Sequence, residues 1–176
     1  MGILDWVYSF MRFSCLVDRQ ANILILGLSN AGKSTLLMKI AYNVPEGLQS
    51  TIRRTPEELV IRNVRFMISD FGSQQGQRLY FHDVVGIFFL IDAADYKRFA
   101  EAKAELDALL AIKEIQTIPI VVMGNKIDHL YAVSEEELRY ELGFEQVHGR
   151  PIELCMCSLA LRPSYGEALR WLANHI

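Results

Sequence analysis

After residue 20, continuous apolar runs alternate with helical patterns along the chain. The runs at 22–26, 86–92 and 118–124 read NILIL, GIFFLID and IPIVVMG, and such runs are typical of strands buried on both faces of a mainly parallel sheet. Further strands are predicted at 58–62, 64–69 and 152–157, the first two joined at Arg62-Asn63 as a hairpin. Helices are predicted at 32–42, 96–112, 134–142 and 164–175. This alternation predicts a doubly wound α/β domain over residues 19–176, with helices on both faces of the sheet.

Residues 1–18 follow a different pattern, that of an amphipathic helix. Its narrow polar stripe would consist of Asp5, Ser9 and Arg12. Its wide apolar face would carry Trp6, Phe10 and Phe13. The segment is too short and too interrupted to span a bilayer. Two interpretations therefore stay open, which do not exclude each other: the segment lies in a membrane interface, or it packs into a groove of its own domain.

Composition narrows the class of protein. The length of 176 residues suits one domain, and the charged fraction of 22% is close to the average of globular proteins, which excludes a disordered chain. The net charge of −3 argues against a dedicated nucleic-acid binder. Cys155 and Cys157 would share one face of a strand, where the geometry disfavours a disulfide between them. The cysteines therefore predict buried thiols in a reducing compartment.

The segment 27–34 reads GLSNAGKS and fits the pattern G-x-x-x-x-G-K-[ST]. It follows a predicted strand and precedes a predicted helix, which is the context that a phosphate-binding loop requires. Backbone N–H groups of such a loop converge on nucleotide phosphates at a helix N-terminus. Lys33 would reach the β- and γ-phosphate oxygens, and the Ser34 hydroxyl would coordinate Mg²⁺.

A second motif selects the base. Asn125, Lys126 and Asp128 form N-K-x-D at the end of a predicted strand. The Asp128 carboxylate can accept from both N1–H and the exocyclic amine of guanine, whereas adenine would leave it unpaired. Asn125 would brace the loop, and the Lys126 stem would lie over the base. Together with the phosphate loop, this motif predicts a guanine-nucleotide protein.

Residues before and after the hairpin strands complete the predicted site. Asp70 ends the third strand, where a carboxylate can hold the hydration shell of Mg²⁺, and Gln74 could orient an attacking water. Thr51 and Thr55 are alternative candidates for a hydroxyl that meets Mg²⁺ only when a γ-phosphate is present.

The chain resembles, along nearly its whole length, the Sar-type small GTPases of the ADP-ribosylation-factor group, which start assembly of the secretory vesicle coat at the endoplasmic reticulum. The resembling segments are LDWVYSF, GLSNAGKSTLL, TPEEL, AADYKRFAEAKAELDALL, GNKID, ELCMCSL and SYGEALRWLANHI. The resemblance implies a phosphate-loop small GTPase fold with a six-stranded, mostly parallel sheet. It also implies a slow hydrolase that depends on an activator, with GTP or GDP as ligand and Mg²⁺ as cofactor.

Several site residues are implied by this resemblance. The phosphates should be wrapped by Asn30, Ala31, Gly32, Lys33, Ser34 and Thr35. Ser34 and Thr51 should hold Mg²⁺, Thr51 being preferred to Thr55 because of its distance from Glu57-Glu58-Leu59. Ser158 and Leu159 should offer backbone N–H groups to O6 of guanine. The implied partners are an exchange factor in the endoplasmic reticulum membrane and inner coat subunits, one of which activates hydrolysis by inserting an arginine. The implied location is the cytoplasmic face of that membrane, in exchange with the cytosol.

The chain also departs from the family pattern. Ser29 stands where the family has Asp, Ser50 where it has Pro, and Gln74 where the catalytic residue is His. Ser73 replaces the Gly whose N–H senses the γ-phosphate. These departures leave a second hypothesis open, a guanine-nucleotide-binding module with weak or absent hydrolysis. A small-molecule phosphotransferase would share the phosphate loop but does not explain Asn125 to Asp128.

Overall fold

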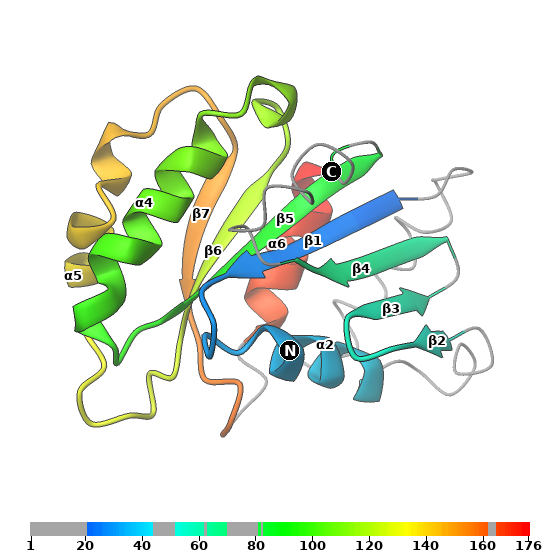
Figure 1. The fold of residues 1–176 in the computed structure, drawn as a ribbon, viewed down its shortest axis with the longest axis horizontal. Helices are drawn as coiled ribbons and strands as arrows, with labels where there is room; N and C mark the ends of the chain where they lie inside the picture. The colour runs from blue at the N-terminus through cyan, green and yellow to red at the C-terminus, as the bar shows by residue number, and fades with distance from the viewer. Residues whose placement is uncertain (1–20, 44–51, 62, 70–80, 82, 162–164) are drawn as a thin grey trace.

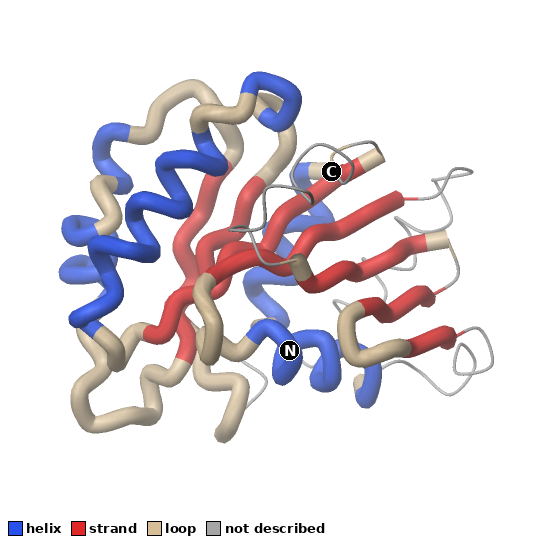
Figure 2. Tube along the Cα trace, viewed as in Figure 1, coloured by secondary structure: helices blue, strands red, loops and turns tan. Residues whose placement is uncertain are grey.

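A seven-stranded sheet forms the centre of the molecule (Figures 1 and 2). The computed structural model describes residues 21–43, 52–61, 63–69, 81, 83–161 and 165–176. The strands are β1 (Ala21–Gly27), β2 (Ile52–Arg54), β3 (Glu58–Ile61), β4 (Val64–Ile68), β5 (Val84–Asp92), β6 (Ile120–Asn125) and β7 (Ile152–Met156). Their order in the sheet is β2-β3-β4-β1-β5-β6-β7. The pairings β2–β3 and β3–β4 are antiparallel, and those that join β4, β1, β5, β6 and β7 are parallel.

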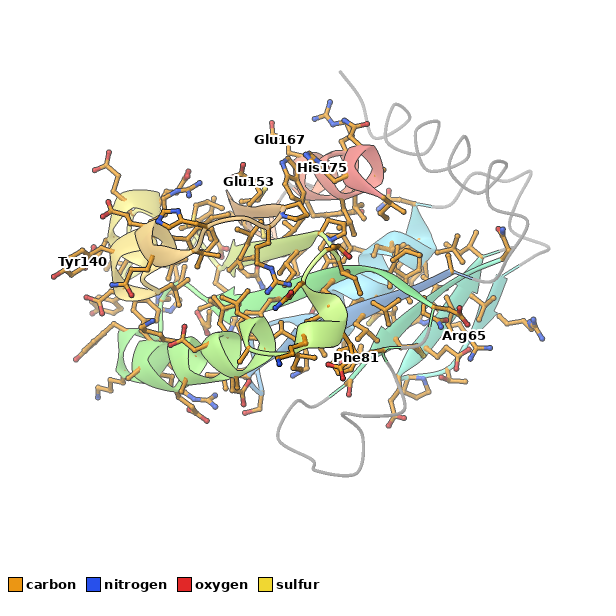
Figure 3. All side chains as sticks on the ribbon, turned by 90° about the horizontal axis from the view of Figure 1, so that it is seen from above. Arg65, Phe81, Tyr140, Glu153, Glu167 and His175 are labelled. Atoms are coloured by element: carbon orange, nitrogen blue, oxygen red, sulfur yellow. The ribbon has the colours of Figure 1, made fainter. Side chains whose placement is uncertain are left out.

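Helices cover both faces of this sheet, so that the molecule has three layers. Helices α2 (Lys33–Tyr42) and α6 (Gly166–His175) pack on one face, and α4 (Phe99–Leu110) and α5 (Glu135–Glu141) pack on the other. The view along the sheet places α6 and α4 on opposite sides of it (Figure 3). The doubly wound α/β architecture that the sequence predicts is therefore confirmed.

Alternation along the strands explains why both faces are apolar. In β1, Ile23 and Ile25 join the core beneath α2 and α6, whereas Leu24 and Leu26 join the core beneath α4 and α5. Because successive side chains of a strand point to opposite faces, a continuous apolar run supplies two cores at once. The runs in β5 and β6 divide between the two cores in the same way.

The strand count differs from the expected six, because β2 is an additional edge strand. Its three residues pair with β3 from Ile52 opposite Ile61 to Arg54 opposite Leu59. Arg53 and Arg54 are exposed, as charged residues on edge strands commonly are. A strand this short and this polar has no apolar run, which is why the hydrophobic pattern did not reveal it.

The predicted helix at 96–112 is divided in the structure. Its first three residues form a 3₁₀ turn, η1 (Tyr96–Arg98), and helix α4 follows; a second 3₁₀ turn, η2 (Lys113–Ile115), lies just beyond the predicted end. Ser134 lies before α5 as its cap, where its Oγ accepts a hydrogen bond from the N–H of Glu137 at 3.2 Å. A third 3₁₀ turn, η3 (Phe144–Gln146), follows α5. Apolar spacing does not distinguish these short turns from α-helix, because their residues are too few to establish a period.

Cys155 and Cys157 are free thiols that contact the same core, as the sequence predicts. Burial raises the pKa of Cys155 to about 11 and that of Cys157 to about 12. The predicted N-terminal region, residues 1–18, lies outside the described residues. Among the helices that the structure does describe, none has the length and apolar character needed to cross a bilayer.

Candidate nucleotide-binding site

The predicted phosphate and base motifs meet at one edge of the sheet. Gly27 ends β1, Asn125 ends β6, and Ser158 follows β7 by two residues. These strands run parallel, so their carboxyl ends lie at the same edge. The crevice at the carboxyl ends of parallel strands is the usual ligand position in open α/β sheets.

The phosphate loop connects β1 to α2 and depends on two glycines. Gly27 and Gly32 have φ values of +127° and +110°, which side chains rarely tolerate. A Cβ at Gly27 would collide with the carbonyl oxygen of Leu90, and one at Gly32 would collide with the side-chain amide of Asn125. The glycines of the motif are therefore required by this backbone path.

Lys33 holds the phosphate loop from within. The side chain is buried, and its Nζ donates to the carbonyl oxygens of Gly27 at 2.6 Å and Leu28 at 3.0 Å. Ser34 and Thr35 lie exposed in the first turn of α2, whose N-terminus presents backbone N–H groups to an anion. The structure thus brings the predicted residues Asn30 to Thr35 together as one loop and helix start.

Asn125 joins the phosphate loop to the segments that are predicted to bind the base. Its Nδ2 donates to the carbonyl oxygen of Ala31 at 2.9 Å, and its Oδ1 accepts from the N–H of Leu159 at 3.0 Å. The residue is 3% exposed, so these bonds form away from water and are costly to lose. The prediction that Asn125 braces the loop is confirmed, and the bracing extends across three segments.

Lys126 is fixed by a carboxylate that the motif does not contain. Its Nζ pairs with Asp92 Oδ2 at 2.6 Å, while Asp92 Oδ1 accepts from the N–H of Ala94 at 3.0 Å. The register places Asp92 beside Asn125. Lys126 has φ of +69°, a left-handed conformation that turns the chain sharply after β6. A carboxylate at the end of the strand next to β6 is the sequence signal that could have revealed this pair.

Asp128 is held by the segment that follows β7. Ser158 Oγ donates to Asp128 Oδ1 at 2.5 Å, and this bond lowers the pKa of Asp128 below its usual range. The carboxylate therefore stays ionised and able to accept further hydrogen bonds. Sequence reasoning expected only a backbone role for Ser158; the structure adds a role for its hydroxyl. The Leu159 N–H, expected to face the base, is the group that donates to Asn125.

Arg98 reaches the phosphate loop from η1, and sequence reasoning missed it. Its Nη1 donates to the carbonyl oxygen of Ser29 at 3.0 Å and contacts Ser29 Oγ at 3.3 Å. Glu101 binds the other edge of the guanidinium. No local pattern signals this contact, because the two partners lie 69 positions apart in the chain.

Several predicted residues are not located by the structure. Thr51, Asp70, Ser73 and Gln74 lie outside the described residues, as do Trp6, Phe10 and Phe13. Thr55 is described: it lies exposed in the turn between β2 and β3, where its N–H donates to the carbonyl oxygen of Glu58 at 2.8 Å. The choice between Thr51 and Thr55 as the Mg²⁺ ligand stays a prediction.

Comparison with known proteins agrees with this arrangement. Residues 7–176 match the model of the ADP-ribosylation factor family. The chain belongs to that family. It is 33% identical over 191 residues to the small COPII coat GTPase SAR1 of Giardia intestinalis, and 32% identical over 197 residues to that of Nicotiana tabacum, covering 100% of both chains in each case. It is 28% identical over 181 residues to ADP-ribosylation factor-like protein 3 of Caenorhabditis elegans, covering 100% of this chain and 97% of that one.

Membership in the ADP-ribosylation factor family confirms the resemblance drawn from the sequence motifs. Proteins of this family are small GTPases, which bind and hydrolyse GTP, and this supports a GTPase activity for the chain. The family match also confirms the fold class, with the additional strand β2 as the difference.

Proposed function

We propose that this protein is a GTP-dependent switch that, once loaded with GTP, binds the endoplasmic reticulum membrane through its N-terminal helix and recruits a vesicle coat for transport to the Golgi. The observation that carries the nucleotide part is the bridge made by Asn125, which links the phosphate loop to the base segment within one buried side chain. The names of the similar SAR1 proteins support the coat part.

Guanine recognition would rest on Asp128 and Lys126. The ionised Asp128 carboxylate accepts from Ser158 and can accept from the two donors on the Watson–Crick edge of guanine. Lys126, held by Asp92, would lay its stem on the face of the base. The backbone N–H group of Ser158 would meet O6, whereas the N–H of Leu159 donates to Asn125. Adenine would leave the Asp128 carboxylate unpaired, which gives strong discrimination.

The phosphates would bind the loop from Asn30 to Thr35, with Lys33 supplying positive charge. The hydroxyl of Ser34 is exposed in the first turn of α2 and is a hard oxygen donor that fits Mg²⁺, which takes few protein ligands beside phosphate oxygens. Thr51 and Asp70 would complete the protein's share of the site. When bound, Mg²⁺ neutralises charge that develops on the phosphate oxygens. Gln74 would orient the attacking water, and a coat subunit would supply an activating arginine.

The hairpin of β3 and β4 is the proposed moving element. Val64 and Phe66 of β4 face the same core as Ile23 and Ile25 of β1, with Phe66 opposite Ile23. Because side chains alternate along a strand, only a shift by an even number of residues keeps Phe66 on the buried side. We propose that GTP loading drives such a shift and releases the N-terminal helix from the domain.

The released helix would bind the cytoplasmic face of the endoplasmic reticulum membrane, where an exchange factor loads GTP. Burial of an aromatic side chain such as Trp6, Phe10 or Phe13 contributes about 1.5–3 kcal/mol, so one helix gives reversible binding. Liposome flotation with GTP and GDP analogues tests this proposal, and we expect recovery only with the GTP analogue. Replacing the three aromatics with serine should abolish flotation and leave nucleotide binding intact. Equal recovery in both nucleotide states would refute the membrane switch.

A guanine-nucleotide-binding module with weak hydrolysis is the alternative, and Ser73 and Ser29 motivate it. A residue with a Cβ at position 73 costs about 1 kcal/mol if the GTP state needs positive φ there. Single-turnover hydrolysis with and without the coat activator separates the two hypotheses. A slow parent that Ser73→Gly accelerates would favour the module, and activator-stimulated turnover in the parent would favour the switch.

A further inference from the structure

Arg98 contacts the phosphate loop at the position where the loop turns. Its Nη1 lies 3.0 Å from the carbonyl oxygen of Ser29 and 3.3 Å from Ser29 Oγ. The next residue, Asn30, has φ of +65°, in the left-handed region. Asparagine adopts this conformation more readily than other residues with a Cβ, but neighbouring contacts still decide whether it is kept. A donor fixed on the Ser29 carbonyl is one such contact.

The guanidinium is itself oriented by a second partner. Glu101 Oε2 accepts from Arg98 Nε at 2.7 Å, and Glu101 Oε1 accepts from Nη2 at 3.1 Å. These bonds occupy one edge of the planar fork and leave Nη1 directed at the loop. They also raise the pKa of Arg98, chiefly through the hydrogen bond to Glu101. An ammonium group has no such fork and cannot reproduce this two-sided geometry.

The position of Arg98 in the fold connects β5 to the loop. Arg98 ends η1, six residues after Asp92, the partner of Lys126. Both residues line a small hollow beside Asn30 and Ala31. The segment from Asp92 to Arg98 therefore contacts the base loop at one end and the phosphate loop at the other.

From this geometry we infer that Arg98 is a positioning residue for the phosphate loop, which it holds in its ligand-binding conformation through Ser29. The inference rests on the proposed nucleotide binding. When the Arg98 guanidinium and its hydrogen bonds are lost, the Ser29–Asn30 turn is free to move. The N–H groups of the phosphate loop then no longer point in fixed directions. Because GDP and GTP share the phosphates that this loop wraps, both should dissociate faster by the same factor.

The test measures dissociation of fluorescent GDP and GTP analogues from the full chain. We expect Arg98→Lys and Arg98→Ala to accelerate both by about fivefold, because each loses a charge-assisted hydrogen bond. The matched control is Lys103→Ala, which removes the exposed ion pair with Asp107 on α4 and should leave both rates within about twofold. The preference for guanine over hypoxanthine nucleotides should not change, because the base segment is untouched.

Repeating the measurement at high salt separates geometry from charge. The electrostatic effect of a distant positive charge is screened at 1 M salt, where the Debye length is about 3 Å. Screening does not restore the hydrogen bonds that are lost with the guanidinium group. We expect the same acceleration at low and high salt. A parental rate in Arg98→Lys, an acceleration that vanishes at high salt, or an equal effect of Lys103→Ala would each overturn the positioning role. Failure of the parent to bind guanine nucleotide would instead overturn the proposed function.

Discussion

The two halves of the sheet share backbone pairing and a buried core but differ in their polar side-chain contacts. In the base half, formed by β5, β6 and β7, buried or half-buried polar side chains such as Asn125 and Asp92 connect neighbouring loops. In the hairpin half, formed by β2, β3 and β4, the strands pair through the backbone, and Arg65 and Glu58 form an exposed ion pair at 3.2 Å. The two halves lie at opposite edges of the molecule, as the positions of Arg65 and Tyr140 indicate (Figure 3).

This difference supports the proposal that one sheet both recognises the nucleotide and changes conformation. Side-chain hydrogen bonds between loops have one correct geometry, so they fix the base site before a ligand arrives. A backbone ladder can reform after a shift, because each residue offers the same donor and acceptor. β6 pairs with β5 over six residues, whereas β2 pairs with β3 over three. We therefore place recognition in the base half and movement in the hairpin half.

The largest expected effect is a change of base preference in Asp128→Asn. A carboxamide offers one donor and one acceptor, which match xanthine but oppose guanine. We expect affinity for guanine nucleotides to fall by about 1000-fold and binding of xanthine nucleotides to appear. Competition against a fluorescent nucleotide measures both. Asp107→Asn, an exposed change on α4, is the control, and an unchanged guanine affinity in Asp128→Asn would contradict the assignment.

Asn125→Ala should destabilise the protein more than any single change in the exposed ion pair of the hairpin half. It leaves the carbonyl of Ala31 and the N–H of Leu159 without their buried partner, which costs about 2–3 kcal/mol of unfolding free energy. Arg65→Ala removes an exposed ion pair and should cost less than about 1 kcal/mol. Urea unfolding at a fixed GDP concentration compares them, and equal losses would remove the distinction between the halves.

Asp92→Asn should weaken nucleotide binding through Lys126. The variant loses the charge that fixes the Lys126 ammonium, and we expect about a three- to tenfold higher dissociation constant for GDP. Glu58→Gln, which neutralises a carboxylate of the hairpin half, serves as the matched control and should change the constant by less than about twofold. If both variants behave alike, the Lys126–Asp92 pair has no role in binding.

The smallest expected effect is a shift in the pH dependence of GDP binding in Ser158→Ala, on the acidic side. The hydrogen bond from Ser158 lowers the pKa of Asp128, so the carboxylate stays ionised, and guanine binding persists, as pH falls through the ordinary range of an aspartate. Without that bond the pKa rises, and binding is lost at a higher pH as the solution is acidified. GDP dissociation constants measured across acidic pH report the shift. Coincident curves for parent and variant would show that Ser158 does not set this pKa.

Much of the fold and of the site followed from local sequence patterns. The motifs at 27–34 and 125–128 predicted Lys33, Asn125 and Asp128 as site residues, because the chemistry of phosphates and guanine restricts which residues can stand at those spacings. Strand β2 and the division of α4 from its 3₁₀ turns were not predicted. Those elements are short, and their formation depends on pairing and packing with neighbours rather than on their own residues.

By itself, the sequence determined the class of this protein: a doubly wound α/β domain of the small GTPase kind, with a phosphate-loop motif and a guanine motif. The tertiary structure decided which residues support that machinery. Arg98 meets Ser29, Asp92 meets Lys126, and Ser158 meets Asp128 only because parallel strands bring their carboxyl ends to one edge of the sheet. The partners are 69, 34 and 30 positions apart, so the contacts form only when the fold brings these segments together; of the three, the Asp92–Lys126 pair alone has a sequence signal, the carboxylate at the end of its strand.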